Sequence, residues 1–95
     1  MPKGYWIAHV TVTDPEAYAG YQAHAPEAFA KFGARFLARG GNFETLEGDA
    51  WDRHVLIEFD SKPQALACYN SAEYQRARTH RDGACTASIV IVEGL

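Results

Sequence analysis

The spacing of apolar residues along the chain predicts four strands. Residues 5–13, 53–59 and 87–94 are rich in β-branched and aromatic residues, which favours strands. Residues 34–41 predict a further strand that ends in a Gly40-Gly41-Asn42 turn. Residues 43–49 would continue this strand as a short extended arm.

A long helix is predicted between the first two strands. Asp14 is a suitable N-cap, and Pro15 suits the first helical position. An apolar stripe then recurs at three- and four-residue steps, made of Tyr18, Tyr21, Ala25, Phe29 and Phe32. Pro26 falls inside this pattern and is expected to kink the helix or split it near His24. Gly33 marks the expected end of the helix.

A second helical region is predicted after the third strand. Ser61 and Gln64 match a capping box, so this helix is expected to begin at Lys62. The Asn70-Ser71 pair interrupts it, and a second helical piece is expected from Ala72 to about Arg81.

The resulting order, β-α-β-β-α-β, predicts an α+β fold: a ferredoxin-like sandwich of residues 1–95, with an antiparallel sheet and helices on one face. The strands are nevertheless apolar on both sides. In the first strand Trp6 and Val10 fall on one face, whereas Ile7 and His9 fall on the other. The face without helices needs a cover, and a symmetric homodimer is its simplest source.

Composition narrows the function classes. The chain has 95 residues and a formal net charge of -3, and it has no run of basic residues, which argues against nucleic acid as a partner. Cys68 and Cys85 lack zinc-ligand spacing and are expected to be small buried residues in a reducing compartment. The first ten residues have no long apolar run, so neither a signal peptide nor a membrane span is expected, and the predicted location is cytoplasmic.

Several motifs together resemble a known family. The segments GYWIAHVTVTDPEAYAGY, RFLARGG, LEG, IEF, YNSAEYQ and VIVEG follow in the order and with the gaps of the family catalogued as domain of unknown function 1330. The resemblance covers essentially the whole chain. It implies a dimeric α/β barrel with a pocket in each subunit, between the sheet and the helices. Relatives in that wider group include cofactor-free monooxygenases, lactone isomerases and haem enzymes, so the resemblance implies no shared set of catalytic residues.

Two positions depart from the family pattern. Ala72 stands where the family usually has proline, and Cys68 stands where it usually has an aromatic residue. Alanine still allows a helix to begin, so the fold implied by the resemblance is unaffected. The smaller Cys68 side chain is expected to enlarge or reshape a nearby cavity.

His9 is the first candidate for chemistry, because a histidine in an apolar central strand must find a hydrogen-bond partner. Glu58 and His54 share one face of the third strand. If the register allows it, His9 could act as a general base with Glu58 as its orienting carboxylate. The alternative is a structural histidine in the core or at the dimer interface.

Arginines and tyrosines supply the other candidates. Arg35 and Arg39 are expected to share one face of the second strand, where they could clamp a carboxylate or enolate. Alternatively, they pair with glutamates and hold the sheet or dimer together. The predicted substrate-binding residues are Tyr18, Tyr21, Tyr69, Tyr74 and His54. Ordinary core packing is the alternative for the tyrosines.

A metal site is not expected. His24, His54 and His80 have neither i, i+4 helical spacing nor a zinc motif, and no Cys or Asp complements them. The chain also lacks a phosphate-binding glycine loop before a helix and a nucleophile elbow.

Two functional hypotheses remain. The first is a cofactor-free enzyme that acts on an aromatic or enolisable compound, with His9 as base, Glu58 as orienting group, Arg35 as anion clamp, and Tyr69 and Tyr74 as donors. The second is a non-catalytic ligand-binding or structural dimer in which these residues form interface networks.

Overall fold

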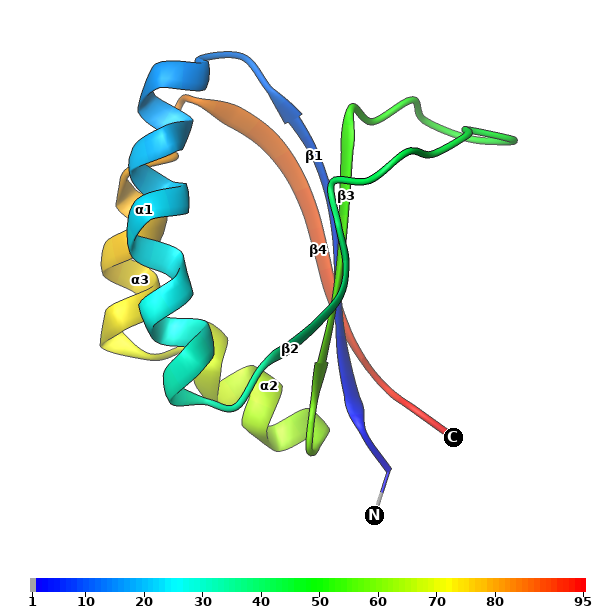
Figure 1. Cartoon of the computed structure of the whole chain (residues 1–95), viewed down its shortest axis with the longest axis vertical. Coiled ribbons are helices and arrows are strands. Elements are labelled where there is room, and N and C mark those ends of the chain that lie inside the picture. Colours follow the sequence, from blue (N-terminus) through cyan, green and yellow to red (C-terminus); the bar gives the residue numbers. More distant parts are fainter. Residues whose placement is uncertain (1) are drawn as a thin grey trace.

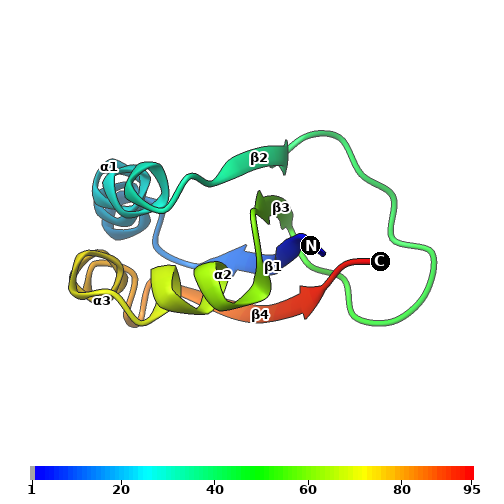
Figure 2. The same cartoon turned by 90° about the horizontal axis from the view of Figure 1, so that it is seen from below.

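The computed structural model describes residues 2–95 as one four-stranded antiparallel sheet with three helices. The elements are β1 Gly4–Val12, α1 Pro15–Lys31, β2 Arg35–Arg39, β3 Arg53–Phe59, α2 Lys62–Tyr69, α3 Ala72–Thr79 and β4 Cys85–Glu93. The strand order is β2-β3-β1-β4, and all helices lie on one side of the sheet (Figures 1 and 2). This arrangement confirms the α+β, ferredoxin-like prediction. Among residues 2–95, no helix is both long and apolar enough to cross a membrane.

The helix starts follow from their capping residues. The side chains of Asp14, Ser61 and Ser71 accept hydrogen bonds from backbone N–H groups in the first turn of α1, α2 and α3. The break at Ser71 is thereby confirmed. The capping box is formed only in part, because the Gln64 amide donates to the carbonyl of Phe32 instead of returning to the cap.

Helix α1 continues through Pro26, so of the two expected outcomes the split near His24 is wrong and the kink stays a prediction. Proline removes one intrahelical hydrogen bond and crowds the preceding turn. The helix keeps this defect because Ala25, Ala28 and Phe29 beside it are buried. Tertiary packing of an apolar face therefore outweighs the local cost.

The segment between β2 and β3 leaves the sheet. Gly40 ends β2 with a φ of 69°, a left-handed conformation that favours glycine. Residues 41–50 are exposed and form no strand, so the extended arm expected at 43–49 is absent. The loop extends away on the side of the sheet opposite the helices (Figure 1). β4 begins at Cys85, two residues before the predicted start.

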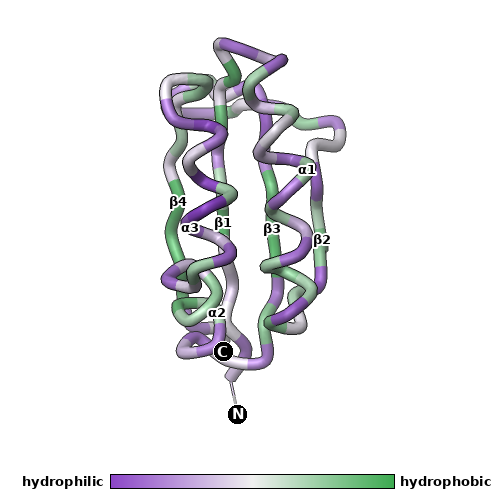
Figure 3. Tube along the Cα trace, turned by 90° about the vertical axis from the view of Figure 1, so that its left-hand side faces the viewer, coloured by the Kyte–Doolittle hydropathy of each residue, from purple (hydrophilic) through white to green (hydrophobic). Residues whose placement is uncertain are grey.

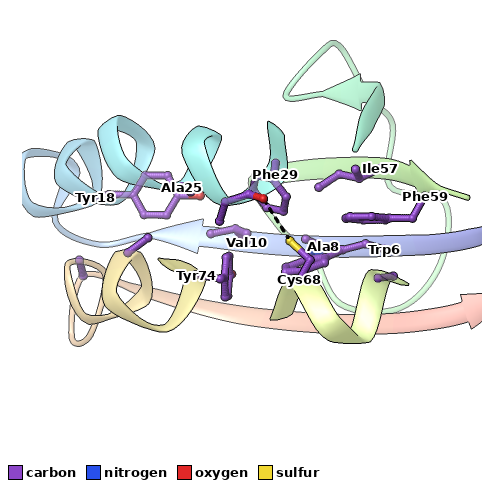
Figure 4. Close-up of a cluster of buried hydrophobic side chains, with 14 residues drawn as sticks. Trp6, Ala8, Val10, Tyr18, Ala25, Phe29, Ile57, Phe59, Cys68 and Tyr74 are labelled. Atoms are coloured by element: carbon purple, nitrogen blue, oxygen red, sulfur yellow. Dashed lines mark hydrogen bonds between the residues drawn. The ribbon is translucent and has the colours of Figure 1, made fainter. Parts of the chain in front are cut away.

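The core lies between the sheet and the helices. Trp6 is 1% exposed, and its ring packs edge-on against Phe29 and Tyr74 at centroid distances of 5.1 and 5.0 Å. Figure 4 shows these side chains converging from β1, α1 and α3. The apolar stretches of the central strands run behind the helices (Figure 3).

Cys68 belongs to this core and not to a cavity wall. Its side chain is fully buried, and its Sγ lies 3.8 Å from the carbonyl oxygen of Ala28 (Figure 4). Burial raises the pKa of the Cys68 thiol to about 12, so the thiol stays protonated and unreactive. The expectation of a small buried residue is confirmed for Cys68, whereas Cys85 is only partly buried.

A β-bulge in β2 changes which way its side chains point. Arg35 lies opposite Glu58 and Phe36 opposite Ile57, but the next paired residue is Ala38, so Leu37 is the extra residue. Arg39 therefore lies opposite Val55 and joins the helix-covered face, whereas Arg35 stays on the open face. The prediction that the two arginines share a face is wrong because one inserted residue inverts the alternation.

Candidate functional site

A cleft lies between α1 and the helix-covered face of the sheet. It is narrow, with a cavity volume of about 60 Å³, and its mouth opens to solvent. Its walls are mostly apolar and come from all four strands and α1. The rings of Trp6, Phe29 and Phe36 line it, and Phe29 contacts Phe36 edge-on at 5.4 Å. A mostly apolar concave site of this kind fits a small organic molecule.

Three arginines also line the cleft. The guanidinium of Arg39 lies 4.4 Å from the ring centroid of Phe36, and that of Arg81 lies 5.3 Å from the ring of Tyr21. Both distances are short enough for cation–π attraction, which helps to fix the cationic groups in place. Arg53 is the third, and its guanidinium packs against the backbone of Gly40.

These arginines lack acidic partners in residues 2–95. No lining residue of the cleft is Asp or Glu, and none of the ion pairs in this part of the chain includes Arg39, Arg53 or Arg81. The Nε of Arg53 is buried and has no hydrogen-bond partner within the described residues. Leaving a buried donor unpaired costs about 1–3 kcal/mol.

Tyr18 and Tyr21 line the same cleft. The Tyr21 hydroxyl lies 2.9 Å from the hydroxyl of Tyr74, which also accepts a hydrogen bond from Nη2 of Arg81 at 3.5 Å. Burial raises the pKa of all three phenols, so they remain protonated at neutral pH. Tyr18 and Tyr21 can therefore serve as hydrogen-bond donors in the cleft.

The other two predicted binding tyrosines do not line this cleft. Tyr74 is fully buried, and its hydroxyl contacts the lining residues Tyr21 and Arg81. Tyr69 packs against Trp6, and its hydroxyl accepts a hydrogen bond from Nη1 of Arg78 at 3.2 Å. For these two residues the core-packing alternative describes the structure better.

His9 and His54 lie on the opposite face of the sheet. They are direct register partners, and their Nδ1 atoms are 2.8 Å apart, so one ring donates a hydrogen bond to the other. Phe43 packs edge-on against His54 at 4.4 Å, and Trp51 lies 6.4 Å from His9. Together with the loop after β2, these residues border a wide hollow that opens to solvent.

The predicted pairing of His9 with Glu58 is wrong. The register places Glu58 opposite Tyr5, four residues along β1 from His9. Glu58 accepts hydrogen bonds from Nε of Arg35 at 2.8 Å and from the hydroxyl of Tyr5 at 3.3 Å. The Arg35 guanidinium and then the Tyr5 hydroxyl hold the pKa of Glu58 below its usual value, although partial desolvation opposes them.

Arg35 forms ion pairs with two carboxylates. Besides Glu58, its Nη2 donates to Asp60 at 3.0 Å. A guanidinium held by two carboxylates is not available to clamp a substrate anion, and the structural-pairing alternative describes Arg35. The predicted site residues are thus divided between the two faces of the sheet.

His24 and His80 lie outside both hollows. Their rings stack at a centroid distance of 4.3 Å, and Nδ1 of His24 lies 2.7 Å from the carbonyl oxygen of Gly20. Within residues 2–95, no three histidine, cysteine or acidic side chains are grouped in a way that could hold a metal ion.

The sequence interpretation missed Arg53 and Arg81, and it named Arg39 as a candidate anion clamp but placed it on the same face as Arg35. Arg53 carried a usable signal, because it precedes Val55 by two residues and so falls on the same face as Val55 and Ile57. No sequence signal indicated the side of the sheet on which Arg39 lies, since the bulge at Leu37 reverses it. Arg81 reaches the cleft from the turn after α3, where no periodicity applies.

The fold is shared with several solved structures. A protein of unknown function from Rhodopseudomonas palustris superposes with a TM-score of 0.81 at 19% identity, covering 99% of this chain and 83% of that one. SnoaB, a cofactor-independent oxygenase from Streptomyces nogalater, matches with a TM-score of 0.62 at 11% identity, covering 97% and 92%. A dimeric protein of unknown function with a ferredoxin-like fold from Bacteroides fragilis matches with a TM-score of 0.58 at 16% identity, covering 96% and 95%.

At such identities these structures share the fold alone with this chain. No curated protein matches the sequence. The model of one family, described as a domain of unknown function (DUF1330), matches residues 3–95. The chain therefore belongs to the DUF1330 family.

Proposed function

We propose that this chain is a homodimeric protein that binds an aromatic or enolisable small molecule in the cleft beneath α1 and acts on it without a cofactor. The observation that carries the proposal is the cleft itself, where Trp6, Phe29 and Phe36 form an apolar wall beside the phenol donors of Tyr18 and Tyr21. A flat ring would fit against this wall, and a carbonyl oxygen would accept from the phenols.

The open face of the sheet supports the homodimer. Val90 is 53% exposed and Val92 is 45% exposed, and Leu46 in the loop after β2 is 85% exposed. Apolar residues grouped on a sheet face favour association with another surface. Two solved relatives of the same fold, from Bacteroides fragilis and Thermobifida fusca, are described as dimeric.

The cleft limits the chemistry that the protein could perform. None of its lining residues is His, Asp or Glu, and its phenols have raised pKa values, so the cleft wall supplies no ordinary general base. A compound that already ionises in water needs no such base. An enolisable substrate is therefore the kind on which this cleft could act, and a solved structure of the same fold is described as a cofactor-independent oxygenase.

The absence of a base among the cleft residues also favours a second candidate, ligand binding without catalysis. The two candidates separate in one experiment. The purified protein is screened by thermal shift against aromatic acids, phenols and 1,3-diketones, because a bound ligand raises the melting temperature by mass action. Each stabilising compound is then incubated with the protein in air, and its consumption is followed by chromatography. Turnover supports the enzyme, whereas stabilisation without turnover supports the binding protein.

The oligomeric state is tested independently. We expect analytical ultracentrifugation to give the mass of two chains at micromolar concentration. A monomer at every concentration tested would contradict the homodimer, and no stabilising compound in the panel would contradict the ligand cleft.

A further inference from the structure

We propose that the ligand of this cleft is an anion, namely an aromatic carboxylate or enolate whose charged group is held by Arg39, Arg53 and Arg81. This inference rests on the proposed function of the cleft and specifies the charge of its ligand.

The first support is an imbalance of charge. Three arginines line one mostly apolar cleft, and none of the lining residues in the described part of the chain is acidic. Arg53 and Arg81 are half-buried and Arg39 is exposed, whereas Arg35 on the open face binds Glu58 and Asp60. Cations that face a largely apolar space repel one another and lose hydration, so the space favours an anion.

The second support is the unpaired donor of Arg53. Its Nε is buried and has no hydrogen-bond partner within residues 2–95. The guanidinium lies beside Gly40, since an added Cβ on Gly40 would fall 2.2 Å from Nη1 of Arg53. A buried donor that is unpaired is satisfied most simply by an acceptor that arrives with the ligand.

The third support is preorganisation. Arg39 stacks on Phe36, and Arg81 stacks on Tyr21 and donates to Tyr74. Side chains that are already ordered lose little conformational freedom when they bind a carboxylate, and the planar guanidinium matches the two oxygens of that group. Arg53 and Arg81 both lie near enough to Tyr18 for their charges to oppose the rise in its pKa that burial causes.

The aromatic part of the ligand follows from the remaining wall. Beside the arginines the cleft offers the rings of Trp6, Phe29 and Phe36. A ligand that joins a flat ring directly to an acidic group would contact both surfaces at once. A phosphorylated sugar or a nucleotide would bring more polar surface than this apolar wall could satisfy.

The test compares ligands of one shape that differ only in charge. Binding of benzoate and benzamide, and of 2-naphthoate and 2-naphthamide, is measured by isothermal titration calorimetry in a phosphate-free buffer of low ionic strength. We expect the acid to bind at least about tenfold more tightly than its amide in the pair whose size fits, since a charge-assisted hydrogen bond to arginine contributes that much. Equal affinity of acid and amide would overturn the anion assignment while leaving the cleft intact.

Substitutions of single arginines test which of them bind the charged group of the ligand. Arg53→Gln and Arg81→Gln are each expected to weaken binding of the acid about tenfold or more and to change binding of the amide less than about twofold. Arg76→Gln, which removes an exposed arginine outside the cleft, is expected to leave both affinities unchanged. If Arg53→Gln does not fold by circular dichroism, Arg81→Gln and the two unmodified ligand pairs still decide the matter. Equal losses for acid and amide would contradict the assignment, and no binding of any of the four compounds would contradict the proposed cleft function with it.

Discussion

On the helix-covered side of the sheet, the cleft arginines form no ion pair within residues 2–95, whereas on the open face Arg35 is held by Glu58 and Asp60. The covered face combines buried rings with cations that lack a counter-charge. The open face combines the ion pair of Arg35 and a hydrogen-bonded histidine pair with solvent-exposed valines. Unpaired cations beside a cleft favour an anionic ligand, and satisfied polar groups beside exposed apolar ones favour association with another surface.

The difference between the two faces assigns ligand binding to the covered face and dimer formation to the open face of the same sheet. The register partners His9 and His54 face away from the cleft, so they lie where we place the partner subunit. The sequence indicated His9, in the middle of a central strand, as a candidate base. Its position on the open face makes it a candidate interface residue instead. The two faces can therefore be disturbed one at a time.

The largest effect is expected for Trp6→Ala on the covered face. Trp6 is 1% exposed and packs against the rings of Phe29, Phe59, Tyr69 and Tyr74. Its removal leaves a cavity that the rings cannot fill, which costs about 3–5 kcal/mol of the free energy of unfolding. Urea denaturation followed by far-ultraviolet circular dichroism measures this loss.

The neighbouring residue Ile7 is the matched control, because it points to the open face. Ile7→Ala is expected to cost about 1 kcal/mol, since its side chain is only half-buried within the subunit. Its effect should also depend on protein concentration if a partner covers this face. If both variants lose the same free energy of unfolding at every protein concentration, the two faces do not differ in the way we propose.

The second effect concerns Val90→Glu on the open face. A carboxylate placed twice in a symmetric apolar interface is desolvated and repelled by its copy, so we expect the dimer Kd to rise at least about 100-fold. The isolated subunit should remain folded, because Val90 is 53% exposed. Sedimentation equilibrium gives the Kd, and Arg76→Glu on the exposed side of α3 serves as the control. An unchanged Kd would place the interface elsewhere.

A smaller and more selective effect is expected at Gly40. Gly40 and Gly48 both have a positive φ, at 69° and 85°, so alanine strains the backbone at either position by about 1–2 kcal/mol. Only at Gly40 does the new Cβ meet the Arg53 guanidinium, which must move; at Gly48 nothing lies within 4 Å.

The two glycine variants should therefore lose similar stability but differ in ligand binding. We expect Gly40→Ala to weaken binding of an aromatic acid and Gly48→Ala to leave it unchanged, as measured by the same calorimetric titration. If both variants bind alike, the position of Arg53 does not determine affinity.

The sequence predicted the order of elements because the order depends on local signals. The caps at Asp14, Ser61 and Ser71 and the alternation in β1 and β3 each act within a few residues. Pro26 is the exception, since burial of the helix face around it overrode a local signal.

The site was less predictable because it depends on register and on irregular backbone. No local sequence signal determines that His9 lies opposite His54 and not near Glu58. The pairing of β1 with β3 joins residues that are about half the chain apart. The single extra residue Leu37 moved Arg39 to the covered face. The spacing of Arg53 to Val55 predicts that Arg53 lies on the covered face, where it would have indicated a charged residue near the helices.

The smallest effect is a pH dependence of the open-face ion pair. The pKa of Glu58 lies below its usual value, chiefly because of the Arg35 guanidinium. The folded state therefore holds fewer protons than the unfolded state in the acidic range where the carboxyl ionises, and the stabilising contribution is complete above the unfolded pKa. It is lost as the pH falls through the folded pKa.

Glu58→Gln is accordingly expected to be less stable than the unmodified protein at pH 7 and to approach it as the pH falls below about 4. Salt should also shrink the difference at pH 7, because Arg35 and Glu58 are both partly accessible to solvent. Glu44→Gln, in the exposed loop after β2, is the control and should change stability little at either pH. Urea denaturation at pH 7 and at pH 3 measures all three proteins. A Glu58→Gln deficit that persists undiminished at pH 3 would mean that the glutamate stabilises β3 through packing, and the open face would then lose its distinction as the side where charges are paired.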